Sequence, residues 1–279
     1  MSDSLLLNIV RGIGKKFNNS FGNPYRPLGI GWFTMRLLKN AAVDKPKTIG
    51  FLDKSISFIK NEDFLHSLRE IFIDHIYRQP AAANALILDC GANIGLSVIY
   101  LKKLFPDATI IAFEPDSLNF SLLQQNMAHF GFRNVELRQE AIYSENTWLD
   151  FSSSGDLGSR IEQGSGGGQV KGVRLKDLLN REITFLKLDI EGAEYKVLMD
   201  AGDAIRNVGR LFIEYHGSFA QNAELNEILQ LITRNGFRYY IKEAAEVYKT
   251  PFKRKPGKMF DVQLNIFCFR DGDETSLAK

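Results

Sequence analysis

Short apolar stretches alternate with amphipathic ones from residue 85 onward, and this alternation constrains the fold more than any other feature of the chain. The apolar stretches are ALILD, ATIIAFE, VELRQEAI, TFLKLD and GRLFIEYH. Helix-like stretches such as GLSVIYLKKLF and SLNFSLLQQNMAHFG lie between them, and a further helix is expected over residues 193–206. Apolar strands that alternate with amphipathic helices predict an α/β fold with a mostly parallel sheet covered on both faces.

The C-terminal part of the chain departs from this order. A predicted helix near residues 223–235 is followed by FRYYIKEA and FDVQLNIFCFR, with only a lysine-rich loop between these two strands. Because no helix separates them, we expect them to pair as an antiparallel hairpin. The stretch QGSGGGQV at residues 163–170 joins two strand-like stretches and is typical of a flexible loop, not of a domain boundary.

Acidic residues stand at the ends of the five predicted parallel strands. In chain order they are Asp89, Glu114, Glu140, Asp189 with Glu191, and Glu214 with His216. Ligands of open α/β sheets bind beyond the carboxyl ends of the strands, so this edge is the predicted site. One such acid alone is more often a helix cap or a loop carboxylate, but an acid at every strand end favours a binding site.

The first strand leads into a turn with the pattern Gly91-x-Asn93-x-Gly95. Its spacing differs from that of a dinucleotide fingerprint and from that of a phosphate loop. Glycine leaves room for a ligand against the backbone, and the carboxylate of Asp89 suits an ammonium group better than a phosphate. Glu114 lies 25 residues after Asp89, a placement at which a carboxylate can accept both hydroxyls of a ribose.

A ligand with an ammonium group at one end and a ribose in the middle is S-adenosylmethionine, which is therefore the predicted cofactor. Glu140 is expected near the adenine. There a carboxylate or the nearby backbone could accept a hydrogen bond from the adenine amino group. The predicted cofactor-binding residues are Asp89, Gly91, Asn93, Gly95, Glu114 and Glu140. The alternative is a plain strand-end turn with exposed acids.

Methyl transfer from a sulfonium requires an aligned nucleophile and a group that removes its proton. His216 titrates near neutral pH and lies beside Glu214, which could orient it and raise its basicity. His216 is the predicted general base, with a structural histidine and a metal ligand as alternatives. Lys187 and Asp189, two residues apart, share a strand face and are also predicted to be catalytic. Asp189 could position the acceptor hydroxyl, take its proton or contact the methionine amine, and a plain salt bridge to Lys187 is the alternative.

Two further acids, Glu191 and Glu194, open the next predicted helix, where the helix dipole favours carboxylates, and Glu194 is expected to be structural. Together, Asp189, Glu191, Glu214 and His216 could bind magnesium. The spacing does not require an ion, so no metal site is assigned and this alternative stays open.

The motifs DCGANIG, FEPD, FLKLDIEGAEYKVL and IEYHG, in this order, resemble those of the FkbM family of S-adenosylmethionine-dependent methyltransferases over roughly residues 85–270. The glycine turn is shared by many class I methyltransferases, whereas K-x-D-x-E-G-x-E at residues 187–194 is more particular to this family. The resemblance implies a class I methyltransferase fold, with a Rossmann-like seven-stranded sheet, and methyl transfer to a hydroxyl oxygen. Acceptors in similar proteins are often sugars or polyketide-like natural products.

Residues 1–80 lack the alternating pattern and are predicted to be a helical accessory segment on the acceptor side. The methyltransferase domain is expected over residues 81–272, followed by a polar tail over 273–279. Helical spacing of apolar residues appears over 6–17 and over 64–78. The aromatic residues Phe21, Tyr25, Trp32 and Phe33 could stack on a sugar, although such side chains more often fill a small core.

Composition narrows the class of protein further. With 44% hydrophobic residues the chain can bury a full core, and no apolar run reaches the roughly 18 residues of a membrane span, so a cytoplasmic protein is expected. Cys90 and Cys268 lack metal-site or disulfide spacing and are predicted to be buried thiols. Residues 1–50 hold eight basic and two acidic residues, a charge of +6, which leaves −4 for the rest of a chain with net charge +2. The acidic remainder argues against nucleic acid as a partner, and the basic N-terminus suggests at most weak peripheral contact with a membrane.

The sequence therefore predicts an S-adenosylmethionine-dependent O-methyltransferase that acts on a hydroxyl of a saccharide or related small metabolite. A macromolecular acceptor, either nucleic acid or protein, is one alternative. A cofactor-binding scaffold without catalytic activity is the other.

Overall fold

The computed structural model describes residues 22–40, 45–80, 82–152, 160–161, 168–253 and 258–270. The chain divides into two compact units between Leu65 and His66, and each unit is described by itself. The domain boundaries and the acceptor-side role assigned to residues 1–80 stay predictions. Several predicted features lie outside the described residues: the helix over 6–17 with the first part of the basic N-terminus, Phe21, the first part of the Gly/Ser-rich loop and the tail over 273–279.

The second unit is built on the predicted seven-stranded sheet. The strand order is β12-β13-β11-β10-β3-β4-β5, in which β3, β4, β5, β10 and β11 are parallel and β13 is antiparallel to both of its neighbours. The strands are β3 (Leu86–Cys90), β4 (Thr109–Phe113), β5 (Val135–Arg138), β10 (Ile183–Leu188), β11 (Val208–Gly217), β12 (Arg238–Glu243) and β13 (Val262–Phe269). This order confirms both the mostly parallel, Rossmann-like sheet and the C-terminal antiparallel hairpin.

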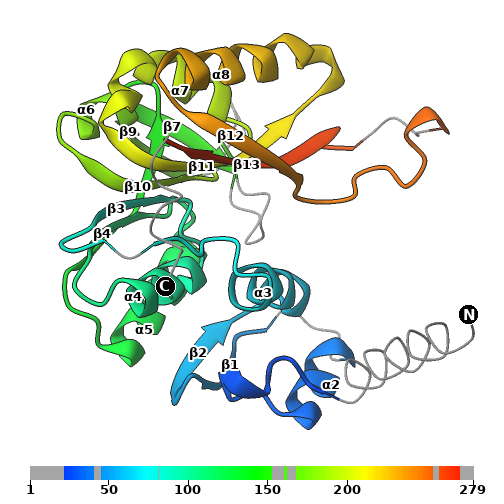
Figure 1. Cartoon of the computed structure of the whole chain (residues 1–279). Coiled ribbons are helices and arrows are strands. Elements are labelled where there is room, and N and C mark those ends of the chain that lie inside the picture. The colour runs from blue at the N-terminus through cyan, green and yellow to red at the C-terminus, as the bar shows by residue number, and fades with distance from the viewer. Residues whose placement is uncertain are drawn as a thin grey trace, which may run out of the picture. The chain divides into compact units, whose positions relative to one another are not determined.

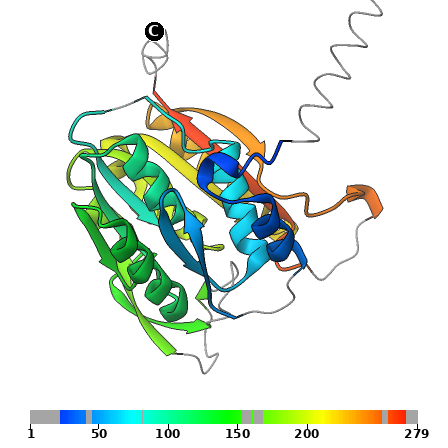
Figure 2. The same cartoon turned by 90° about the horizontal axis from the view of Figure 1, so that it is seen from below.

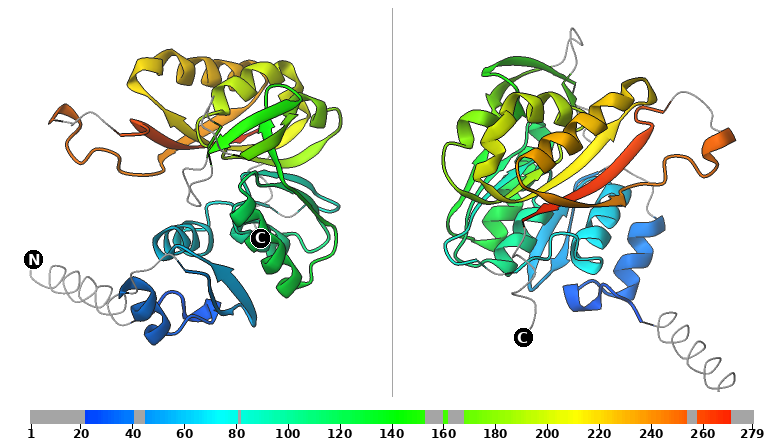
Figure 3. Two further views of the ribbon diagram at one scale, coloured as in Figure 1. Left: turned by 180° about the vertical axis from the view of Figure 1, so that it is seen from behind. Right: turned by 45° about the horizontal axis from the view of Figure 1, so that its top comes forward.

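Helices cover both faces of this sheet (Figures 1 and 3). The helices are α4 (Leu96–Leu104) and α5 (Ser117–Phe130) on one face, and α7 (Glu194–Ala201) and α8 (Asn222–Arg234) on the other. In Figure 2 the teal and green helices α4 and α5 lie in front of the sheet. The predicted helix over 193–206 is shorter than expected, because α7 gives way at Gly202 to the 3-10 turn Gly202–Asn207.

Alternation along the strands decides which side chains enter the core. Leu186 and Leu188 of β10 pack with Val197 and Leu198 of α7 in one large apolar cluster. Successive strand residues point to opposite faces, so Lys187 points to the α4 side of the sheet. The two cysteines are buried free thiols, as predicted.

A second, four-stranded sheet follows the edge strand β5 in the chain, and its strand order is β6-β9-β7-β8. Its strands are β6 (Glu140–Tyr143), β7 (Thr147–Ser152), β8 (Arg160–Ile161) and β9 (Gly168–Arg174). The single strand predicted from VELRQEAI is therefore wrong: β5 ends at Arg138, and the chain then pairs with β9 instead of continuing beside β4. Glu140 consequently begins β6 and does not end a strand of the main sheet.

In the first unit, the described residues are not only helical as predicted. They form α2 (Trp32–Asn40), the start of α3 (Asn61–Leu68) and a hairpin of β1 (Lys47–Phe51) with β2 (Lys54–Phe58). The hairpin turns through Leu52 and Asp53, both with positive φ, and lacks the Asn-Gly or Asp-Gly pair that signals such a turn in a sequence. Trp32 and Phe33 are exposed and do not fill a core.

The helix predicted over residues 64–78 is shorter than expected, since α3 passes into the π-helical segment Arg69–Ile73 and ends there. None of the helices in the described ranges is long and apolar enough to cross a membrane.

Candidate active site

A cavity of about 470 Å³ lies at the carboxyl ends of β3, β4, β10 and β11, within the second unit. Its lining includes the predicted residues Gly91, Asn93, Glu114, Asp189 and His216. This is the edge at which open parallel sheets bind ligands. The structure thus brings together most of the residues that the sequence singled out. Asp89 and Gly95 support the turn beside the cavity instead of lining it.

The glycine turn is held against the sheet by its backbone. The N–H groups of Gly91 and Ala92 both donate to the carbonyl oxygen of Phe113, at 3.0 and 2.9 Å. Gly91, Asn93 and Gly95 all have positive φ, a conformation that glycine and asparagine tolerate best. A Cβ atom on Gly91 would lie only 1.9 Å from the carbonyl oxygen of Asp189, so no side chain fits there.

Glu114 is buried between the turn and the start of α5. Its Oε2 accepts a hydrogen bond from the Asn93 N–H at 2.8 Å, and its Oε1 accepts one from the Asp116 N–H at 2.9 Å. Burial raises the pKa of Glu114 to about 7, although these two hydrogen bonds counteract the shift. Each carboxylate oxygen can accept a second hydrogen bond, so the predicted contacts with two ribose hydroxyls remain available.

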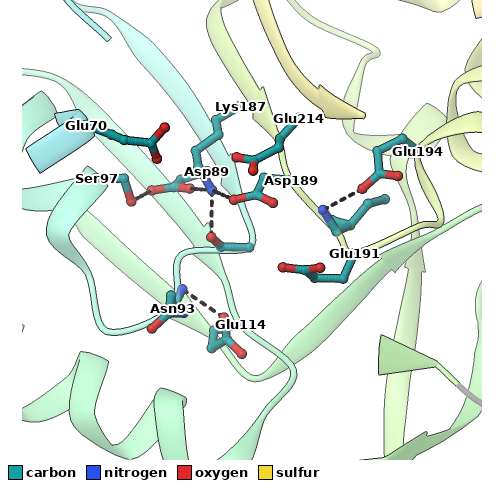
Figure 4. A network of polar contacts seen from close by, with 12 residues as sticks. Glu70, Asp89, Asn93, Ser97, Glu114, Lys187, Asp189, Glu191, Glu194 and Glu214 are labelled. Atoms are coloured by element: carbon teal, nitrogen blue, oxygen red, sulfur yellow. Dashed lines mark hydrogen bonds and ion pairs between the residues drawn. The ribbon is translucent and has the colours of Figure 1, made fainter. Parts of the chain in front are cut away.

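An ion-pair network lies beneath the turn, and Lys187 is at its centre (Figure 4). The Lys187 Nζ lies 3.0 Å from Oδ2 of Asp189 and 3.4 Å from Oδ1 of Asp89, and it donates to the carbonyl oxygen of Gly91 at 2.7 Å. Burial lowers the pKa of Lys187, but Asp189 and Asp89 raise it by more, so the pKa lies well above its usual value. The lysine is therefore charged, and it ties β3, β10 and the turn together.

Asp89 already has two partners inside the protein. Its Oδ2 accepts a hydrogen bond from the Ser97 hydroxyl, and its other oxygen faces Lys187. The sequence predicted an ammonium group beside Asp89, and the structure places the one of Lys187 there. Direct contact of Asp89 with the ammonium group of a cofactor stays a prediction.

Glu140 lines the cavity from the start of β6. Its Oε1 lies 2.6 Å from Nζ of Lys171, its register partner on β9. The pair holds the carboxylate in place at this side of the cavity, where the sequence analysis expects the adenine.

His216 points from β11 into a group of carboxylates. Its Nδ1 lies 3.2 Å from Oε1 of Glu194, whereas its Nε2 lies 3.6 Å from Glu191 and 3.8 Å from Glu214. From the sequence, Glu214 was predicted to orient His216 and Glu194 was expected to be structural. In the structure Glu194 holds the ring, and its own carboxylate accepts from the N–H groups of Ile190 and Gly192. Tight chain reversal at residues 190–192, with positive φ at Glu191, places Glu194 there.

The carboxylates around His216 alter one another's protonation. Burial lowers the pKa of His216, but the hydrogen bond to Glu194 and the nearby negative charges raise it by more, to about 10. Burial, together with the charges of Asp189 and Glu194, raises the pKa of Glu191 to about 8. Burial and the charge of Asp189 also raise the pKa of Glu214 well above its usual value. This cluster therefore holds protons at neutral pH and can exchange them with a bound ligand.

Three side chains at the site were missed by the sequence analysis. Ser97 donates to Asp89, Glu70 lines the cavity, and the ring of Phe260 lies 4.8 Å from that of His216. Burial and the charge of Asp189 raise the pKa of Glu70. Glu70 lies in the π-helical segment, and such segments are frequent at functional sites, but a glutamate on a predicted helix carries no signal of that kind in the sequence.

Residues 89–239 match the model of a protein family that is described as the Methyltransferase FkbM domain. Methyltransferase 1 of Beauveria bassiana (strain ARSEF 2860) is 30% identical over 198 residues, which cover 59% of this chain and 79% of that protein. The 31-O-demethyl-FK506 methyltransferase FkbM of Streptomyces tacrolimicus is 22% identical over 237 residues, covering 68% of this chain and 89% of that protein.

Among solved structures, methyltransferase FkbM from Methylobacillus flagellatus KT aligns with a TM-score of 0.49 and 17% identity. The alignment covers 73% of this chain and 48% of that one, so the chain spans about half the length of this neighbour. The matched domain spans more than half of the present chain and contains the glycine turn, Glu114, the Lys187 network and His216. The chain therefore belongs to the FkbM methyltransferase family.

Proposed function

We propose that this protein is an S-adenosylmethionine-dependent O-methyltransferase that methylates a hydroxyl of a saccharide or a related small metabolite. The observation that carries the proposal is the position of Glu114. This buried carboxylate follows β4, accepts a hydrogen bond from the glycine turn, and lines the same cavity as Asp189 and His216. The proposal assigns the ribose to Glu114 and the methyl acceptor to Asp189 and His216.

In this proposal the cofactor lies along the carboxyl edge of the sheet. Glu114 accepts the ribose hydroxyls, and Glu140 and the backbone beside it face the adenine. The methionine end lies over Gly91, Asn93 and the start of α4, near the carboxylate of Asp189. The turn suits this task because the positive φ of Gly91, Asn93 and Gly95 lets it bend sharply between β3 and α4 beside the cavity.

Methyl transfer from a sulfonium requires the protein mainly to align the acceptor hydroxyl and to remove its proton. A lone pair of the acceptor oxygen forms the new bond to the methyl carbon while the carbon–sulfur bond breaks and its electrons stay on sulfur. The sulfonium becomes a neutral thioether, and the hydroxyl proton passes to the protein. Asp189 and His216, which also line the cavity, are proposed to position the hydroxyl. Lys187 holds Asp189 in place through the 3.0 Å contact of its Nζ with Oδ2.

The role of His216 depends on its protonation. With a pKa of about 10 its imidazolium form prevails at neutral pH, so a proton must leave the His216 cluster before this ring can act as a base. Glu191 lies 3.6 Å from Nε2, and with a pKa of about 8 it is also mostly protonated at neutral pH, so the cluster becomes a better proton acceptor as the pH rises through about 8. We therefore propose the cluster as a unit, not His216 alone, as the acceptor of the hydroxyl proton.

Support for a hydroxyl acceptor comes from a relative. The Streptomyces tacrolimicus protein is named as a methyltransferase of 31-O-demethyl-FK506, which is a small molecule methylated on oxygen. A cavity lined with carboxylates also suits a polyhydroxylated acceptor, because each carboxylate accepts hydrogen bonds from hydroxyl groups.

Calorimetric titration with S-adenosylhomocysteine tests the proposal, with NAD as the control ligand. We expect micromolar binding of S-adenosylhomocysteine, no binding of NAD, and a loss of at least about tenfold in affinity for Glu114→Ala, since a charge-assisted contact is worth more than about 1.4 kcal/mol. Glu182→Ala is the matched control because Glu182 is exposed and does not line the cavity. An affinity of Glu114→Ala within twofold of the parent would refute the ribose assignment.

Other outcomes distinguish the alternatives. Binding of the cofactor product without methyl transfer to any tested saccharide or small-molecule pool would favour the scaffold. Transfer of labelled methyl groups to RNA or protein would favour a macromolecular acceptor. No binding of S-adenosylhomocysteine by the folded protein would remove the enzyme proposal.

A further inference from the structure

We propose that Asp189, Glu214 and His216 form a binding site for one divalent metal ion. The binding itself does not depend on the proposed function, but the catalytic role described below rests on it. One ligand atom from each of the three residues lies within 4.8 Å of the other two. An ion at about 2.1 Å from each ligand fits such a triangle with small side-chain movements.

Neighbouring parallel strands create this triangle. Asp189 follows β10 directly, and Leu188 of β10 is the register partner of Ile213 on β11. Asp189 therefore lies beside Glu214. His216 is two residues further along β11 and so points to the same face of the sheet. Glu214 and His216 belong to β11 and Asp189 follows β10 directly, and regular elements hold ligands more firmly than loops do.

The second, independent observation is the orientation of His216. Its side chain is only 3% exposed, and Nδ1 is held by Glu194, a fully buried carboxylate fixed by two backbone N–H groups. With Nδ1–H donated to Glu194, the lone pair of a neutral imidazole is on Nε2, which faces the carboxylates of Glu191 and Glu214. A histidine whose other nitrogen donates to a carboxylate is the usual arrangement of a metal ligand.

The balance of charge also calls for a cation. Around the site, the six carboxylates of Glu70, Asp89, Asp189, Glu191, Glu194 and Glu214 outnumber the basic groups near them, which include Lys187, His216, His66 and Lys258. Figure 4 shows these carboxylates and Lys187. Lys187 pairs with Asp89 and Asp189, whereas Glu191 and Glu214 lie beside His216. A divalent ion at the triangle would offset this excess at short range.

The donor set indicates which ions fit. Two carboxylates suit Mg²⁺ and Mn²⁺, whereas an imidazole nitrogen favours Mn²⁺, Fe²⁺ or Zn²⁺ over Mg²⁺. Manganese satisfies both preferences. Three protein ligands leave coordination positions that face the cavity, because all three residues line it.

An ion at this position would bind the acceptor hydroxyl and lower its pKa. The acceptor oxygen would then form its bond to the methyl carbon while the carbon–sulfur bond breaks and its electrons stay on sulfur, and the hydroxyl proton would leave to solvent. With the ion bound, Nε2 of His216 would be a ligand and could not act as the base.

Titration of the full chain with Mn²⁺, followed by electron paramagnetic resonance of the free ion, tests the site without cofactor or acceptor. We expect one saturable site per chain, weakened at least about tenfold in Glu214→Gln and in His216→Asn. Glu182→Gln is the matched control and should bind like the parent, because Glu182 is exposed and lies away from the cavity. Absence of saturable binding, or equal binding by all four proteins, would overturn the proposal.

A second measurement tests the site in the parent protein, so it does not depend on whether the variants fold. The chain has four histidines, so their imidazole resonances can be followed by NMR in the parent protein. Zn²⁺ at one equivalent should shift the His216 ring, and shifts confined to the other three rings would contradict the site. Titration with S-adenosylhomocysteine separates this proposal from the proposed function: cofactor binding without metal binding removes the ion site alone, and metal binding without cofactor binding removes the function alone.

Discussion

At the scale of single residues, Glu114 connects local structure with ligand binding. One of its oxygens accepts from the Asn93 N–H in the turn, and the other accepts from the Asp116 N–H at the start of α5. The carboxylate therefore connects the two segments that follow β3 and β4. Its position was predictable, because the apolar stretch ATIIAF ends immediately before it. Its raised pKa was not, because burial depends on what surrounds the strand end.

The pKa of Glu114 predicts a pH dependence of cofactor binding. Burial raises this pKa to about 7, so the carboxyl group is mostly protonated at pH 6 and mostly ionised at pH 8. Ribose hydroxyls donate more strongly to the ionised form, so binding favours loss of the proton. Affinity for S-adenosylhomocysteine should therefore rise with pH, by up to about tenfold between pH 6 and 8.

Calorimetry at both pH values measures this rise. Glu114→Gln is the control, since an amide does not titrate: its affinity should be lower than that of the parent at pH 8, and its pH dependence should be smaller. An equal rise in parent and variant would assign the titration to other groups in the cavity.

At the scale of elements, the site depends on how the turn after β3 meets the end of β10. The absent side chain at Gly91 lets the carbonyl oxygen of Asp189 approach, and Lys187 then reaches the carbonyl oxygen of Gly91. The sequence indicated Gly91 as a place where a ligand can lie against the backbone. The structure shows that another strand end already occupies one side of it.

Gly91→Ala and Gly131→Ala together test this contact. Both glycines have positive φ, at 88° and 64°, but a Cβ on Gly131 would meet nothing within 4 Å, whereas one on Gly91 would meet the Asp189 carbonyl at 1.9 Å. We expect Gly131→Ala to lower the free energy of unfolding by about 1 kcal/mol, from backbone strain alone. Gly91→Ala should lower it by about 3 kcal/mol or more, because a steric clash with backbone is added.

Urea unfolding followed by circular dichroism measures both losses. An equal decrease in the free energy of unfolding of the two variants would mean that β10 can move away from the turn at a small cost in free energy. That result would contradict the rigid contact between Gly91 and Asp189.

The elements themselves were predicted unevenly, for a physical reason. Strands β3, β4, β10 and β11 and helices α4, α5 and α8 were predicted correctly because their burial leaves a periodic apolar pattern. Hairpin β1–β2 was missed because its turn lacks glycine and asparagine. The break between β5 and β6 was missed because the chain keeps a strand-like pattern on both sides while it changes pairing partner.

At the scale of the whole molecule, the division of the chain into two units separates two questions about function. Each described residue that lines the cavity, from His66 to Gln263, lies after the division between Leu65 and His66. The predicted role of the first unit on the acceptor side can be separated from cofactor binding by experiment.

A chain that begins at Lys60 keeps α3 and the second unit. We expect it to bind S-adenosylhomocysteine within about threefold of the full chain, a change of less than about 0.7 kcal/mol, because the cavity residues are retained. Methyl transfer to an acceptor should fall strongly if residues 1–59 shape the acceptor side.

Calorimetry measures the affinity of the shortened chain for S-adenosylhomocysteine, with circular dichroism as the check on folding. Transfer of labelled methyl groups measures its activity. Loss of cofactor binding in a folded shortened chain would contradict the division.

By itself, the sequence determined the order of strands and helices in the sheet unit and the acids that stand at the strand ends, because periodicity and strand termination are local properties of the chain. Tertiary structure decided which of these groups meet. The order of strands places β10 beside β3, so that Lys187 is the register partner of Asp89, a residue 98 positions earlier in the chain. It also places Glu194, not Glu214, on Nδ1 of His216, because the reversal at residues 190–192 folds the start of α7 back over β11. Contacts between distant segments depend on pairing and packing of the whole sheet, and no local pattern encodes them.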